Sequence, residues 1–249
     1  MIINKDFASG ESLGKRQRQE DFCSFILLDE QTSFSNGVLA VIADGMGGHA
    51  AGDEASKIAV RTFSDFFLNN KSDLLTLFTH SLNEANNKIK ILSDNVGICG
   101  CTLIAALIFD NYLKWISVGD SLLYVYRNGE LKKQNADHSL YPILIEQYNR
   151  GEISIEEVNQ NKNVLCSAVD GNKLELVDIN VEGINLEEND VILLATDGIE
   201  TLEENEIRQA LEDYSDITDA KGMSDVLLNM VSNKGIQHQD NTTVMVIKI

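Results

Sequence analysis

The sequence predicts an α+β fold in which a pair of antiparallel β-sheets is flanked by helices. Segments with helical periodicity come in pairs, and runs of strand-like segments separate these pairs. Short turns join successive strands, which indicates antiparallel pairing because parallel strands need long crossovers. Several strands are apolar on both faces, as expected of strands stacked between two layers.

The first part of the chain contains two predicted strands followed by two predicted helices. Phe22–Leu28 and the apolar run Gly37–Ala43 are typical of strands. A helix is predicted to begin near Asp53, because apolar residues recur there at helical spacing. A second amphipathic helix follows, and Ser72 is its predicted N-cap.

The middle of the chain changes to strand periodicity. Thr102–Phe109 and Tyr112–Val118 form a predicted hairpin around the turn Asp110-Asn111. The strand Leu122–Tyr126 comes next, and Asn128-Gly129 after it is a strong signal for a two-residue hairpin turn.

The last part of the chain begins with residues 136–169, a more polar and locally helical segment that we interpret as an inserted flap. Asp190–Ala195 is a predicted apolar strand. Two helices, Glu203–Tyr214 and Met223–Ser232, precede the final strand Thr242–Ile249.

Composition favours one globular domain covering residues 1–249, since no linker, repeat or low-complexity tract divides the 249 residues. The apolar runs are strand-sized and the N-terminus lacks the order of a signal peptide, so we expect a cytoplasmic protein without membrane attachment. A net charge of −19 argues against nucleic-acid binding, which needs basic patches. The four cysteines are too few and too irregular for a disulfide framework.

Four aspartates occupy similar places in this predicted fold. Asp44, Asp120, Asp197 and Asp240 each lie where an apolar strand meets a turn. A carboxylate in that place is held by a rigid element and can project into a cleft, which suits a metal ligand. Glycine beside the first three lets the backbone approach, so that the carbonyl of Gly45 is a further candidate ligand.

Glu20 and Asp21 add two acids just before a strand. Oxygen ligands favour magnesium or manganese, and no histidine pair at ligand spacing supports zinc. The alternative for any one of these sites is an ordinary Asp-Gly turn. The same arrangement at four places favours a shared metal site over four unrelated turns.

These acids stand in motifs whose order and spacing resemble those of the type 2C, metal-dependent protein serine/threonine phosphatases, in their bacterial form. The resemblance runs from about Gly10 to the C-terminus. Its motifs are Arg16-Gln17-Arg18-Gln19-Glu20-Asp21, Ala43-Asp44-Gly45-Met46-Gly47-Gly48-His49, Gly119-Asp120-Ser121, Ala195-Thr196-Asp197-Gly198 and Asp240-Asn241. The resemblance implies a four-layer αββα sandwich of two antiparallel sheets flanked by helix pairs.

The resemblance also implies a two-metal site for Mn²⁺ or Mg²⁺. Asp44 matches the aspartate that bridges two ions, and the Gly45 carbonyl matches a ligand of the second. Asp197 and Asp240 match the other ligands of the first ion, and Asp120 matches a ligand of a third, more weakly held ion.

Three further residues acquire roles through the same resemblance. Glu20 and Asp21 match acids that act on the metal cluster through water and hydrogen bonds, and Arg16 matches the phosphate-binding arginine. We expect phosphoserine and phosphothreonine hydrolysis by direct attack of a metal-bridging hydroxide. Met46 stands where many eukaryotic relatives have histidine, which leaves the general acid unassigned.

The resemblance implies phosphorylated protein substrates, among them a serine/threonine kinase encoded elsewhere and the targets of that kinase, and it implies a monomer. Two alternatives differ in class. A non-catalytic member that only binds phosphoproteins would lack metal aspartates, whereas the core ones are present. A phosphoesterase of small phosphate esters would favour a glycine-rich phosphate loop, and the Gly-Lys-Ser/Thr signature of such a loop is missing.

Overall fold

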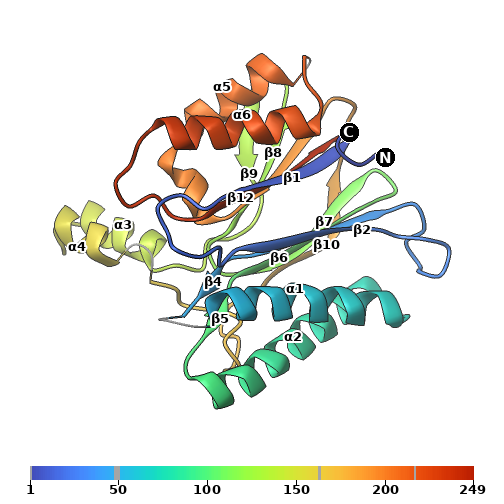
Figure 1. The fold of residues 1–249 in the computed structure, drawn as a ribbon, viewed down its shortest axis with the longest axis horizontal. Coiled ribbons are helices and arrows are strands. Elements are labelled where there is room, and N and C mark those ends of the chain that lie inside the picture. The colour runs from blue at the N-terminus through green and yellow to red at the C-terminus, as the bar shows by residue number, and fades with distance from the viewer. Residues whose placement is uncertain (1, 48–50, 162–163, 216) are drawn as a thin grey trace.

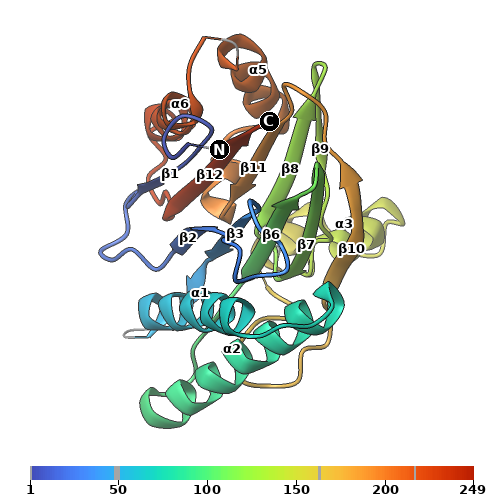
Figure 2. The ribbon, with the colours of Figure 1, turned by 90° about the vertical axis from the view of Figure 1, so that its right-hand side faces the viewer.

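Two five-stranded antiparallel sheets lie face to face in the computed structural model, which describes residues 2–47, 51–161, 164–215 and 217–249. The first sheet has the order β1 (Phe7–Ser12), β12 (Thr242–Lys248), β11 (Val191–Ala195), β8 (Leu122–Arg127) and β9 (Glu130–Lys133). Figure 2 shows these strands side by side in this order, from left to right. The second has the order β10 (Asp178–Asn185), β7 (Tyr112–Val118), β6 (Leu103–Phe109), β3 (Val38–Ala43) and β2 (Phe22–Leu27). A short pair, β4 (Gly45–Met46) and β5 (Gly100–Cys101), lies beside the second sheet.

Helix pairs cover the outer faces of both sheets (Figure 1). The helices α1 (Gly52–Asn69) and α2 (Leu74–Val96) cover the second sheet, and α5 (Glu204–Tyr214) and α6 (Ala220–Asn233) cover the first. The predicted four-layer αββα sandwich is therefore confirmed.

Apolar clusters fill the three spaces between the four layers, and β3 explains why its sequence is apolar throughout. Leu39 and Val41 pack in the cluster beneath α1 and α2, whereas Ala40 and Ile42 pack in the cluster between the sheets. Side chains alternate across a strand, so a strand between two layers must be apolar at every position.

Between the two helix pairs, the segment predicted as a flap contains α3 (Tyr141–Asn149) and α4 (Ile155–Asn161), which project from one end of the sandwich (Figure 1). No residue of α3 is buried, and Val158 is the buried residue of α4. That this segment acts as a flap, and that residues 1–249 form one domain, stay predictions.

The structure corrects several details. The side chain of Asp73, not Ser72, caps α2 by accepting a hydrogen bond from the Thr76 N–H at 3.0 Å. The strands β1 and β10 were not predicted. β1 is short and partly polar, and its partner β12 lies at the other end of the chain. In β10, Gly183 at φ 81° interrupts the alternation where the register shifts.

Over the ranges that the structure describes, none of the helices combines the length and the apolar character needed to cross a membrane.

Candidate active site

A cavity of about 390 Å³ opens where loops from both sheets meet, and it gathers the predicted site residues. Its lining includes Arg16, Glu20, Asp44, Gly45, Asp120, Asp197 and Asp240. Asp21, the remaining predicted residue, does not line the cavity and is 2% exposed. Segments more than 200 residues apart in sequence thus supply one site, since the ion pair of Arg16 and Asp240 spans 224 positions.

Asp44 follows β3 directly, and a hydroxyl holds its backbone. The Asp44 N–H donates to Thr102 Oγ1 at 2.9 Å, and the Thr102 N–H donates to the Asp44 carbonyl at 2.9 Å. Thr102 Oγ1 also lies 2.7 Å from Ser121 Oγ, next to Asp120. Thr102 therefore links the turns that carry Asp44 and Asp120.

Gly45 owes its place to a close approach of three backbone segments. A Cβ at this position would lie 2.2 Å from the Gly52 carbonyl oxygen and 2.5 Å from the Glu20 carbonyl oxygen. Both neighbours are backbone atoms, so no side-chain rearrangement could relieve the clash. The Gly45 N–H donates to the Glu20 carbonyl at 3.1 Å, which ties the two acidic motifs together.

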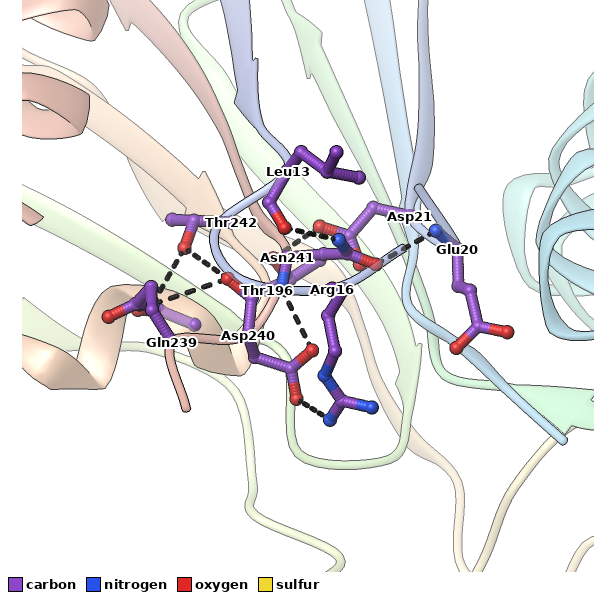
Figure 3. Close-up of polar contacts among 10 residues, drawn as sticks. Leu13, Arg16, Glu20, Asp21, Thr196, Gln239, Asp240, Asn241 and Thr242 are labelled. Carbon is purple, nitrogen blue, oxygen red and sulfur yellow. Dashed lines mark hydrogen bonds and ion pairs between the residues drawn. The ribbon is translucent and has the colours of Figure 1, made fainter. Parts of the chain in front are cut away.

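Asn241 joins the first motif to the last (Figure 3). Its Oδ1 accepts from the Glu20 N–H at 2.9 Å, and its Nδ2 donates to the Leu13 carbonyl at 3.0 Å. The side chain is 3% exposed and satisfied at both ends. Asn241 thereby fixes the loop that carries Arg16 against the strand that carries Asp240.

Arg16 and Asp240 form an ion pair across this junction, with Arg16 Nη2 2.5 Å from Asp240 Oδ2 (Figure 3). Asp240 Oδ1 accepts from the Asn241 N–H at 2.8 Å. Partial burial opposes the charge of Arg16, but the hydrogen bond and the charge of Asp240 outweigh it and raise the pKa of the guanidinium. The guanidinium is half-exposed, so an anion entering the cavity can reach it.

The other carboxylates crowd negative charge into a poorly solvated space. Burial raises the pKa of Asp44 well above its usual value, and the charges of Asp21, Asp197 and Asp120 add to the shift. Burial, with the charge of Asp197, likewise raises the pKa of Asp120 to about 7. Such a cluster favours bound protons or bound cations, because either one offsets the repulsion.

Asp21 lies behind the cavity and is only half-satisfied. Its Oδ2 accepts from Thr196 Oγ1 at 2.9 Å, whereas no described residue donates to the buried Oδ1. Burial raises the pKa of this carboxyl to about 7, although the hydrogen bond from Thr196 opposes the shift. A buried oxygen without a donor fits the predicted role of Asp21 as an acceptor for metal-bound water.

The donors fit hard divalent cations, although they are not gathered as a finished ligand set. In the described part of the chain, no three His, Cys, Asp or Glu side chains lie close enough together to hold one ion by themselves. Asp240, one of the predicted ligands, contacts Arg16 instead. The cavity otherwise offers carboxylate and carbonyl oxygens with the negative charge that Mg²⁺ or Mn²⁺ requires. Which of these oxygens binds which ion stays a prediction.

His138 connects the segment 136–169 to the turn that holds Asp120. The imidazole Nδ1 accepts from the Gly119 backbone N–H at 3.2 Å, and the backbone N–H of His138 donates to the Gly119 carbonyl at 3.1 Å. Burial lowers the pKa of the imidazole, so the neutral form is favoured. Gly119 has φ 100°, in the left-handed region that favours glycine.

Gly48 and His49 of the second motif lie outside the described residues.

Sequence reasoning included Ser121 and Asn241 in two of the motifs but assigned no role to them or to Thr102. Asn241 is the second residue of the motif Asp240-Asn241, and Thr102 is a polar residue just before the buried strand β6. Those are weak signals, since the role of each residue depends on partners from distant segments.

Comparison with known proteins gives one family. The model of the family described as protein phosphatase 2C matches residues 14–232. The serine/threonine phosphatase stp of Listeria monocytogenes is 30% identical over 226 residues, which is 86% of this chain and 85% of that protein.

Solved structures agree. The serine/threonine phosphatase of S. agalactiae superposes with a TM-score of 0.80 at 25% identity, covering 98% of each chain. The catalytic domain of the serine/threonine phosphatase PstP, solved in complex with 2 manganese ions, gives 0.76 at 25% identity, with 97% of this chain and 96% of that chain covered. Motif order, fold and cavity agree with this match over most of the chain, and the protein belongs to the protein phosphatase 2C family.

Proposed function

We propose that this protein is a metal-dependent serine/threonine phosphatase that hydrolyses phosphoserine and phosphothreonine in proteins. The observation that carries the proposal is the cavity that combines Arg16 with the four motif aspartates Asp44, Asp120, Asp197 and Asp240. Its family membership and its relatives named as serine/threonine phosphatases support the same activity.

The chain's own residues divide into cation-holding and supporting groups. Asp44, the Gly45 carbonyl, Asp197 and Asp240 would hold two Mn²⁺ or Mg²⁺ ions, and Asp120 would hold a third. When bound, such cations activate water for attack on phosphorus and neutralise the charge on the phosphoryl oxygens.

Glu20 and Asp21 are supporting residues beside the carboxylates that would hold the cations. Glu20 is anchored through its N–H to Asn241, and its side chain lines the cavity. Asp21 Oδ1, which has no partner among the described residues, is available to hydrogen-bond water within the site. These two carboxylates also add to the negative charge that attracts the cations.

Arg16 binds the substrate phosphoryl group. A guanidinium presents two parallel N–H donors to two oxygens of a phosphate, so it fixes the orientation of the group as well as neutralising it. In the structure one of these donors, Nη2, contacts Asp240 Oδ2. Binding of a cation by Asp240 would release Arg16 for the phosphoryl group, which links loading of the site to substrate binding.

The leaving-group proton has no assigned donor. Met46 lies in the cavity lining, and that lining contains no histidine among the described residues. A partner kinase, a monomeric state and a cytoplasmic location stay predictions.

The test is an assay of phosphate release from p-nitrophenyl phosphate and from a phosphothreonine peptide, with manganese, with magnesium and with EDTA. We expect metal-dependent release from both, abolished in Asp197→Asn. Asp94→Asn is the matched control, because it makes the same chemical change on the exposed surface of α2. A folded protein that releases no phosphate with either metal would instead be a binding module. Release from the small ester alone would favour the small-ester phosphoesterase.

A further inference from the structure

A second cavity, of about 430 Å³, adjoins the candidate active site. Asp120 lines both cavities, so the second begins where the first ends. Its walls come from β8, from the 3-10 helix η1 (Asp197–Thr201) with the start of α5, and from the segment that leads into α3. A protein substrate whose phosphorylated residue occupies the first cavity can therefore reach the second with a neighbouring side chain.

The charged groups of this second cavity all have the same sign. They are Asp120, Asp137, Glu200, Glu203 and Glu204, and no lysine, arginine or histidine among the described residues belongs to the lining. Local structure accounts for some of them. Glu203 caps α5, and Asp137 lies 3.9 Å from Lys133. Acids in the first turn of a helix also interact favourably with its dipole.

Tyr124 supplies an independent observation. It is 7% exposed, and its hydroxyl has no hydrogen-bond partner among the described residues. Burial, followed by the charges of Glu204, Glu200 and Asp137, raises the pKa of the phenol to about 12. Tyr124 and all three of those carboxylates line the cavity. Because this hydroxyl has no partner among the described residues, a ligand in the cavity that donates a hydrogen bond can supply one.

The remaining walls suit the rest of a long side chain. Leu122, Leu202 and Ile207 supply buried apolar surface. Lysine and arginine combine an apolar stem with a cationic group that only donates hydrogen bonds. An apolar wall, a ring hydroxyl and several carboxylates complement each part of such a side chain.

We propose that this second cavity binds a lysine or arginine side chain of the phosphoprotein substrate, close in sequence to the phosphorylated residue. The inference rests on the proposed phosphatase function and adds a substrate preference to it. The cavity would make the enzyme favour basic phosphorylation sites.

Single-lysine phosphothreonine peptides test this preference. The set consists of an uncharged phosphothreonine peptide and derivatives with one lysine at each of about four positions on either side, since an extended chain of that length reaches roughly 13 Å. We expect one or two lysine positions to raise kcat/KM roughly tenfold, equivalent to one charge-assisted hydrogen bond in a poorly solvated site.

Two variants assign the preference to the cavity. Glu204→Gln removes a charge and Tyr124→Phe removes the hydroxyl, and each should reduce the lysine preference by roughly threefold or more. Asp94→Asn, which removes a charge from the exposed surface of α2, should keep it. Hydrolysis of p-nitrophenyl phosphate, which carries no cationic side chain, is measured on every variant to show that the fold and the catalytic cavity are intact.

Several results would overturn the inference. One is a wild-type enzyme that cleaves the uncharged peptide as well as every lysine peptide. Another is a lysine preference that survives in both variants. A third concerns the variants Glu204→Gln and Tyr124→Phe. If they need a different manganese concentration from the wild type for p-nitrophenyl phosphate hydrolysis but keep its peptide preference, the cavity is a cation site. If the wild-type enzyme releases phosphate from none of the substrates, the phosphatase function itself is refuted, and so is the binding of a substrate lysine or arginine in the second cavity.

Discussion

Replacement of Thr102 by valine tests whether the hydroxyl that links two aspartate turns is needed to build the site. Thr102 is 3% exposed, and its Oγ1 accepts from the Asp44 N–H at 2.9 Å and lies 2.7 Å from Ser121 Oγ. Valine has nearly the same shape but no oxygen. The substitution therefore removes both hydrogen bonds and leaves packing almost unchanged.

The magnitude follows from the groups left behind. A buried donor without an acceptor costs roughly 1–3 kcal/mol, and the Ser121 hydroxyl loses its partner as well, so we expect a total of about 2–4 kcal/mol. For a chain of this size, each kcal/mol lowers Tm by about 2–4 °C, which gives a decrease of roughly 5–15 °C. Because Asp44 and Asp120 lose a shared support, the manganese affinity should fall by about 10–100-fold.

Thermal unfolding and manganese titration of p-nitrophenyl phosphate hydrolysis measure these two effects. Thr102→Ser is the matched control, because it keeps the oxygen and removes one methyl group at a cost of about 0.5–1.5 kcal/mol. We expect serine to retain the manganese dependence of the wild type. A valine variant with wild-type Tm and manganese dependence would refute the reasoning, as would a serine variant as impaired as valine.

Three further predictions concern the remaining site residues. Arg16→Ala should raise KM for phosphopeptides roughly tenfold. It should leave Tm almost unchanged, because an exposed ion pair contributes less than about 1 kcal/mol to stability. A decrease in Tm without an effect on KM would assign Arg16 a structural role. Gly45→Ala should destabilise the protein by about 1–3 kcal/mol, measured by urea unfolding, because the new Cβ meets backbone atoms at 2.2 and 2.5 Å; wild-type stability would show that the backbone gives way. The pKa of Asp21 rises from 3.8 to about 7 on folding, so the folded state binds one more proton than the unfolded state between these two pH values. The free energy of unfolding in EDTA should therefore fall as the pH rises from about 4 to 7, by up to about 4 kcal/mol. Manganese should reverse this loss near pH 7, and a metal-free protein that gains stability over the same range would contradict the assignment.

Much of the fold could be predicted because its signals are local. The strands β6, β7 and β8 and the turn at Asn128-Gly129 lie where the alternation and the turn dipeptide place them, and both turn residues have positive φ. The pairing of β1 with β12 could not be predicted, because it joins the two ends of the chain and β1 has little apolar character. The cap of α2 was misplaced by one residue, since Ser72 and Asp73 are both good capping residues and geometry selects one of them.

The sequence by itself determined the layered α+β architecture and the set of acids at the strand ends, since periodicity and residue chemistry are properties of short segments. Only the tertiary structure decided which of these acids share a cavity, that Asp21 lies behind it, and that Arg16 contacts Asp240. It also decided that Thr102 and Asn241 hold the site together. The physical reason is that a hydrogen bond or a carboxylate cluster depends on distances between segments far apart in the chain, which folding sets and no local pattern encodes.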